Sequence, residues 1–174
     1  MPATSTLHPI LSLPFVDRTR RNHGLEHATL TLLAQKVHRL RMAGRSTPNG
    51  FYLYGSVSTE AVTEAAHEAL RRMKNGETSL AVHPNCGTNF VTAGVAAACA
   101  AYLGFFGANN WRARWERLPF VAILTTLALI FSQPLGLALQ REVTTSGDMR
   151  GLEIVSVQRR GRGGLVTHFV ATRG

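Results

Sequence analysis

The fold is decided by residues 87–140, which read GTNFVTAGVAAACAAYLGFFGANNWRARWERLPFVAILTTLALIFSQPLGLALQ. Two charge-free runs lie in this stretch, Gly87–Gly107 with 21 residues and Leu118–Gln140 with 23. A helix that crosses the hydrocarbon core of a bilayer needs about 20 apolar residues. A buried hairpin in a soluble core is the alternative, but a 174-residue chain has little other structure to cover two such runs. We therefore predict a two-helix transmembrane hairpin.

Outside the hairpin the chain is polar and basic. Residues 78–140 hold only four of the 29 Asp, Glu, Lys and Arg side chains. This uneven distribution argues against a disordered chain and against a uniformly soluble globule. With two cysteines, of which Cys99 lies inside the first run, a disulfide scaffold is also excluded.

Two spans place both ends of the chain on one side of the membrane. We expect a cell (inner) membrane protein with both termini in the cytoplasm, because positive-inside counting favours the side of Arg71, Arg72, Lys74, Arg141 and Arg150. The turn is predicted over 108–117, where two tryptophans beside three arginines are typical of a membrane surface.

The runs divide the chain into four parts. These are an N-terminal tail (1–16), the first part of a polar domain (17–86), the hairpin (87–140) and a C-terminal β-hairpin that completes the domain (141–174). The predicted fold class is α+β: a small, mostly antiparallel sheet with two helices, interrupted by the two-helix transmembrane hairpin.

Capping and turn residues place the elements of the polar domain. Asp17 is the expected N-cap of a helix that runs to Met42 and is closed by Gly44. Ser58 is the expected cap of a second helix, which ends at Asn75. Strands are predicted over 51–54, 79–83, 152–157 and 165–171.

The first helix contains the motif His23-Gly24-Leu25-Glu26-His27. Residues three and four apart share one helical face, so both imidazoles can bind one Zn²⁺ with Glu26 beside them. This is the inverted order of a metalloprotease motif, in which the carboxylate deprotonates a metal-bound water. We predict His23 and His27 as zinc ligands and Glu26 as the candidate catalytic base.

A second cluster, His83-Pro84-Asn85-Cys86-Gly87, stands where the polar domain meets the first span. His83 and Cys86 are predicted as further metal ligands. All four ligands would close a structural tetrahedral site, whereas three with water would leave a catalytic position. Asn22 and Asn89, which flank the clusters, are predicted to orient ligands or to bind a substrate carbonyl.

Read together, the two clusters resemble a known family. With Gly44-Arg45-Ser46 and Gly50-Phe51-Tyr52-Leu53-Tyr54-Gly55 they look like the bacterial domain-of-unknown-function family 6391, from about residue 21 to 171. The His-x-x-Glu-His and His-Pro-x-Cys-Gly-Thr blocks are also similar to YqhQ-like membrane proteins. The resemblance implies that the two blocks belong to one constellation, and it implies no activity.

The basic residues are almost all arginine. Anionic lipid headgroups are the predicted partners of Arg18, Arg20, Arg21, Arg159, Arg160 and Arg162. The loop between the last two strands is predicted over 159–164. Nucleic acid is not an expected partner, because no aromatic residues interleave with these arginines. The sequence sets no oligomeric state.

These features lead to alternative functions. The first is a membrane-anchored, zinc-binding protein, with hydrolase or peptidase activity if Glu26 acts as a general base. The others are a non-enzymatic membrane scaffold or assembly protein. Such a scaffold would contain a structural metal site or a metal-free network of polar side chains in its core.

Overall fold

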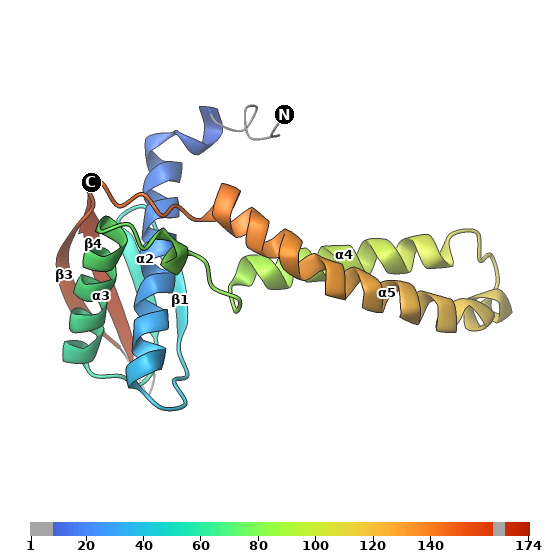
Figure 1. The fold of residues 1–174 in the computed structure, drawn as a ribbon. Coiled ribbons are helices and arrows are strands. Elements are labelled where there is room, and N and C mark those ends of the chain that lie inside the picture. The colour runs from blue at the N-terminus through green and yellow to red at the C-terminus, as the bar shows by residue number, and fades with distance from the viewer. Residues whose placement is uncertain (1–8, 162–165) are drawn as a thin grey trace. The chain divides into compact units, whose positions relative to one another are not determined.

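The computed structural model describes residues 9–161 and 166–174. Its contacts group the chain into two compact units, one made of residues 1–83 and 141–174 and the other of residues 84–140. The first unit holds helices and a sheet, and the second is a helical hairpin (Figure 1). The mixed α+β class predicted from the sequence is confirmed. The predicted tail, 1–16, falls partly outside the described residues, and its last three positions belong to helix α2 (Pro14–Lys36).

Within its described residues, the first unit contains one four-stranded sheet. Its strands are β1 (Ala43–Thr47), β2 (Gly50–Tyr54), β3 (Glu153–Arg160) and β4 (Thr167–Arg173). The strand order is β1-β2-β4-β3, and every pairing is antiparallel. In the register of β2 on β4, Leu53 lies opposite His168. The sheet therefore joins strands from both sides of the hairpin in the sequence.

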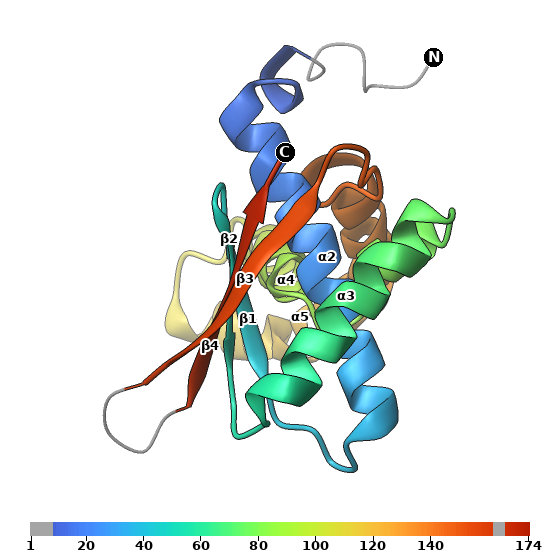
Figure 2. The ribbon, with the colours of Figure 1, turned by 90° about the vertical axis from the view of Figure 1, so that its left-hand side faces the viewer.

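Two helices, α2 and α3 (Thr59–Lys74), cover one face of this sheet (Figure 2). The Ser58 hydroxyl accepts a hydrogen bond from the Ala61 amide, which confirms the predicted cap. The apolar stripe of α3 is buried against the core, and Leu25 and Leu33 of α2 meet it there. From β2, Phe51 and Leu53 point into the same core because alternate strand residues face one side.

The first helix differs from its predicted limits. Asp17 is not the N-cap: helix α2 begins at Pro14, and Asp17 lies in its first turn, in an ion pair with Arg21. The helix ends at Lys36, and Gly44 belongs to β1, a strand that the sequence did not predict. Leu40 and Met42 continue the apolar pattern, but they pack against the core from the connecting segment. Tertiary packing therefore outweighs helical periodicity there.

The predicted strand 79–83 is also wrong. Residues Thr78–Ala81 form a short 3₁₀ helix, η1. Its last residue, Ala81, is buried, and the carbonyl oxygen of Ala81 is hydrogen-bonded to His27 rather than to a neighbouring strand. The amides of Leu80 and Val82 donate within the segment, to the carbonyls of Glu77 and Ser79, so these donors are not used in a sheet.

The second unit consists of α4 (Gly87–Phe105) and α5 (Trp111–Leu139), which run side by side (Figure 1). The predicted turn and the predicted start of the second span at Leu118 are corrected: Asn110 caps α5 by accepting from the Ala113 amide, so Trp111–Arg117 is helical. The helix continues through Pro134 and leads into a π-helical turn, η2 (Gln140–Thr144).

Close backbone approach holds this helical pair together. A Cβ atom added to Gly104 would lie 2.6 Å from a methyl carbon of Val121, and one added to Gly136 would lie 2.5 Å from the Asn89 side chain. Among the described residues, α4 and the α5–η2 segment are long and apolar enough to cross a membrane. In the apolar 18-residue stretch of each, only 17% is buried.

Candidate functional site

Three imidazoles gather in the first unit. His23 and His27 lie one turn apart on α2, and their ring centroids are 4.4 Å apart. His83, just after η1, brings its ring to 5.9 Å from that of His27. One ring nitrogen of His23 lies within 4.8 Å of one of His27. The structure therefore brings together the three predicted histidine ligands of this unit.

Backbone carbonyls orient two of these rings. The Nδ1 atom of His27 lies 2.8 Å from the Ala81 carbonyl oxygen, and the Nδ1 atom of His23 lies 2.9 Å from that of Thr144. A carbonyl oxygen only accepts hydrogen bonds, so Nδ1 carries the proton in both rings. In a neutral imidazole the lone pair is then on Nε2, the usual arrangement of a histidine that binds metal.

Glu26, the residue before His27 on α2, is buried, with 4% of its surface exposed. Its carboxylate accepts a hydrogen bond from the Ser46 hydroxyl of β1. The backbone of Gly44, two residues earlier, lies so close that an added Cβ would be 2.1 Å from Oε1 of Glu26. Both residues of β1 therefore fix the position of this carboxylate.

The motif glycine of the first helix has a packing role. A Cβ atom on Gly24 would lie 2.3 Å from the Ser146 carbonyl oxygen. Segment 142–146 is also held by Arg20, whose guanidinium donates to the carbonyl oxygens of Glu142, Val143 and Thr145. Gly24 thus allows α2 to approach the segment whose Thr144 carbonyl orients His23.

Cys86 belongs to the second unit, where it precedes α4 and its sulfur accepts from the Thr88 amide. It follows His83 by three residues, and three peptide units reach about 11 Å at most. The chain connection therefore keeps Cys86 in the neighbourhood of His83. Neither Cys86 nor Cys99 forms a disulfide with another cysteine in the described part of the chain.

Asn22 and Asn89 make structural hydrogen bonds within their own units. Asn22 is fully buried, donates to the Thr47 carbonyl and accepts from the Thr172 hydroxyl, so it ties α2 to both β1 and β4. Asn89 donates to the Pro84 carbonyl and accepts from the Gln140 side chain, which links the start of α4 to the end of α5. Their predicted roles toward a ligand or substrate stay predictions.

Several of the arginines predicted to contact lipid headgroups form contacts within the protein. Besides Arg20, Arg21 pairs with Asp17 and donates to the Arg150 carbonyl. Arg159 and Arg160 belong to β3 rather than to a loop, and Arg162 lies outside the described residues. The guanidinium of Arg160 lies 4.9 Å from the ring centre of Phe169 on β4, an aromatic neighbour that the order of residues in the chain does not reveal.

Residues 18–157 match the family described as Domain of unknown function (DUF6391). The chain belongs to this family. An uncharacterized protein of Picosynechococcus sp. is 34% identical to it over 153 residues, which cover 76% of this chain and 74% of the relative. No solved structure matches. The similarity to YqhQ-like proteins stays a prediction.

In this DUF6391 member, the structure gives a structural role to one of the sequence blocks on which the family resemblance rests. The Gly44-Arg45-Ser46 block contacts Glu26 through its two outer residues. Sequence reasoning noted this block without assigning it a role. In the sequence, Gly44 and Ser46 stand out as a small residue and a hydroxyl on either side of Arg45. Only the packing of α2 against β1 shows that both contact the Glu26 carboxylate.

Proposed function

We propose that this protein is anchored in a membrane by α4 and α5 and holds a zinc ion through His23 and His27. The observation that supports the metal site best is the orientation of the two imidazoles. Each directs its protonated Nδ1 to a backbone carbonyl, which leaves Nε2 as the ligand atom. Two nitrogens bound to one zinc lie roughly 3.3 Å apart, which is compatible with rings at 4.4 Å between centroids.

His83 and Cys86 are the further ligands in this proposal. His83 is supported by its ring contact with His27. Cys86 is supported by its place three residues later in the chain and by its ligand type, since imidazole and thiolate together suit zinc. All the side-chain donors of the set are nitrogen or sulfur, the pattern of zinc sites rather than of calcium or magnesium sites.

The anchor is supported by the exposed surface of the second unit. Phe90, Tyr102, Phe120 and Phe131 of α4 and α5 each expose more than half of their surface. Apolar side chains exposed around both helices are unfavourable in water and favourable in lipid. Because the hairpin joins the polar domain at both ends, the histidine cluster is a few residues from the start of a span in the sequence.

A hydrolytic role is the second candidate, and Glu26 is the residue that favours it. A buried carboxylate fixed by Ser46 beside two metal ligands is suited to accept a proton. Zinc, when bound, lowers the pKa of a coordinated water toward neutrality. In a closed four-ligand site, Glu26 would instead stabilise a ligand imidazole, and the protein would be a membrane scaffold or assembly component.

The metal is tested on the full chain purified in detergent. Elemental analysis should find about one zinc per chain in the wild type and a large loss in a His23→Ala/His27→Ala variant. His67→Ala is the matched control, because His67 is an exposed histidine on α3. Wild-type protein with little zinc, or a double variant that retains it, would contradict the site and favour a metal-free polar network.

Glu26→Gln separates the two candidate functions. Both predict that the variant keeps its zinc, because Glu26 is not assigned as a ligand. The hydrolase candidate also predicts that the wild type cleaves a fluorescent casein substrate and that the variant does not. A zinc-loaded wild type without this activity would favour the structural site.

The anchor has a separate test. The full chain should remain in the membrane pellet after alkaline carbonate extraction and should be released by detergent. Release by carbonate alone would show that α4 and α5 do not span a bilayer.

A further inference from the structure

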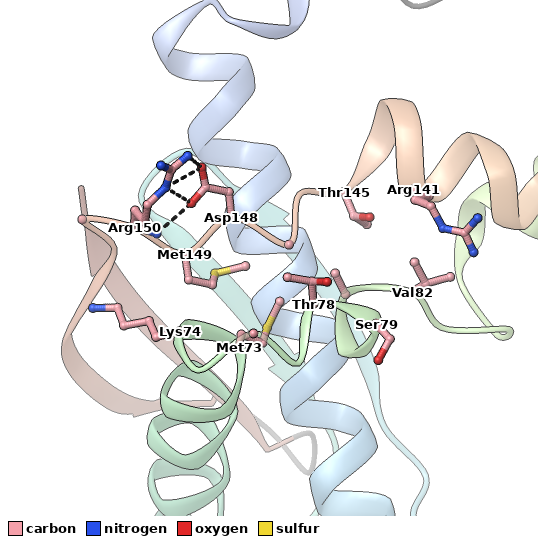
Figure 3. Close-up of a pocket in the computed structure, with 14 residues that line it drawn as sticks. Met73, Lys74, Thr78, Ser79, Val82, Arg141, Thr145, Asp148, Met149 and Arg150 are labelled. Carbon is pink, nitrogen blue, oxygen red and sulfur yellow. Dashed lines mark hydrogen bonds and ion pairs between the residues drawn. The ribbon is translucent and has the colours of Figure 1, made fainter. Parts of the chain in front are cut away.

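A pocket of about 940 Å³ opens in the first unit (Figure 3). Its walls come from two segments that are far apart in the sequence, residues 73–82 and 141–151. None of the residues assigned above to zinc or to proton transfer lines this pocket. The proposed zinc site therefore does not account for this pocket.

The wall of the pocket carries an excess of positive charge. Three cationic side chains line it, Lys74 at the end of α3, Arg141 in η2 and Arg150 before β3. The lining also includes one carboxylate, Asp148, whose two oxygens are bound by the Arg150 guanidinium at 2.7–3.2 Å. This contact holds the pKa of Asp148 well below its usual range, so the pair is a neutral unit at physiological pH.

Lys74 and Arg141 are left with their charges uncompensated. Neither forms an ion pair with any carboxylate in the described part of the chain. Figure 3 shows them at opposite ends of the pocket, with Met73 and Met149 between them. Thr78 and Ser79 also line the wall, and a hydroxyl group can donate a hydrogen bond. Two cations and two hydroxyls around an apolar floor suit a phosphate group that carries an apolar or glycerol portion.

Both covalent links between the units leave from this pocket. Val82 lines it and is separated from the second unit by one residue, and Arg141 lines it and is the first residue after that unit. If α4 and α5 span a bilayer, these links keep the pocket near the membrane surface. We propose that the pocket binds the phosphate headgroup of an anionic phospholipid, with Lys74 and Arg141 as the two cations whose charge attracts it. This inference rests on the membrane anchor of the proposed function and is independent of the zinc site.

The test uses the full chain in detergent and counts bound lipids by native mass spectrometry. The probes are phosphatidylglycerol and phosphatidylcholine with identical acyl chains. We expect selective binding of phosphatidylglycerol, weakened roughly 30-fold in a Lys74→Ala/Arg141→Ala variant, since each cation contributes about a factor of five. The control variant Arg45→Ala/Arg173→Ala also removes two exposed cations, but from the sheet, and should bind like the wild type.

Three results would overturn the proposal. One is equal binding of the two lipids by the wild type, and another is wild-type binding by the Lys74→Ala/Arg141→Ala variant. The third is displacement of the lipid by inorganic phosphate or glycerol phosphate at equal concentration, which would assign the pocket to a soluble phosphate compound. Loss of binding must occur with unchanged far-ultraviolet circular dichroism. Carbonate extraction reports on the anchor separately, so failure of the anchor and failure of the pocket can be distinguished.

Discussion

The imidazole of His27 and the backbone carbonyl of Ala81 lie 2.8 Å apart, and both are buried. This hydrogen bond joins the middle of α2 to the last residue of η1, two residues before His83. It therefore holds the segment that carries the third imidazole against the helix that carries the first two. In the proposed zinc site the same bond would orient His27, and it links α2 to η1 whether or not a metal is bound.

We expect His27→Ala to destabilise the protein even when no metal is present. The substitution leaves the buried Ala81 carbonyl without its partner, which costs about 1–3 kcal/mol. Denaturant unfolding in the presence of a chelator measures this free energy. His67→Ala should change it by less than about 0.5 kcal/mol, because His67 is exposed. Equal stability of His27→Ala and wild type would show that the bond contributes nothing to folding.

Gly44→Ala should displace Glu26. The added methyl group would lie 2.1 Å from Oε1 and 2.4 Å from the carboxyl carbon of Glu26, and this side chain is buried and cannot move into solvent. We expect a loss of about 1–3 kcal/mol in unfolding free energy. Combining it with Glu26→Ala should cost less than the sum of the two single changes, because the clash disappears.

Gly94→Ala is the control for that experiment. An added Cβ at Gly94 meets no atom within 4 Å, so the free energy of unfolding should stay close to that of the wild type. An additive Gly44→Ala/Glu26→Ala double variant would contradict the proposed contact between β1 and the carboxylate.

Asn22→Ala should lower stability by about 2–4 kcal/mol. The amide of Asn22 bridges the Thr47 carbonyl at 2.8 Å and the Thr172 hydroxyl at 2.7 Å, and both groups would lose a buried partner. A double-mutant cycle with Thr172→Val measures the share that belongs to one of these bonds. A coupling energy near zero would show that Asn22 and Thr172 act independently.

His168 makes stability depend on pH. Burial, followed by the positive charge of Arg159, lowers the pKa of His168, and its Nδ1 atom has no hydrogen-bond partner in the described part of the chain. The unfolded chain therefore takes up this proton at a higher pH than the folded protein does. The contribution to stability is complete above the ordinary histidine pKa of about 6.5 and declines as the pH falls below it.

Denaturant midpoints measured from pH 8 to pH 5 test this dependence. The wild type should lose stability toward acid more steeply than His168→Gln, in which the titrating group is absent. Arg159→Ala should reduce the steepness in part, since it removes one cause of the shift. Identical slopes for wild type and His168→Gln would show that His168 does not control the acid response.

The sequence was sufficient for features that depend on local pattern. Charge-free runs located α4 and most of α5, and Ser58 marked the N-terminal cap of α3. The spacing of His23 and His27 placed them on one helical face. In each case, residues near one another in the chain determine the outcome, through helix geometry or hydrophobic length.

Features that depend on distant partners could not be predicted. The strand β1 has the sequence AGRST, which carries no apolar alternation, and it forms because it pairs with β2 and packs against Glu26. The segment 79–83 has strand-like residues, but the Ala81 carbonyl bonds to His27. Likewise, the hydrogen bonds of the Ser46 hydroxyl and of the two carbonyls that orient the imidazoles join α2 to distant segments. They cannot be predicted before the packing of these segments is known.

The position of β4 between β2 and β3 has a consequence for biosynthesis. Translation proceeds from the N-terminus, so β1, β2 and both domain helices leave the ribosome before the hairpin, whereas β3 and β4 follow it. Until β4 emerges, the edge of β2 that it will occupy is exposed, and the Thr172 hydroxyl that Asn22 requires does not yet exist. The domain can thus reach its native core only after the ribosome has completed the apolar hairpin, which makes synthesis of the hairpin an obligatory earlier step in maturation.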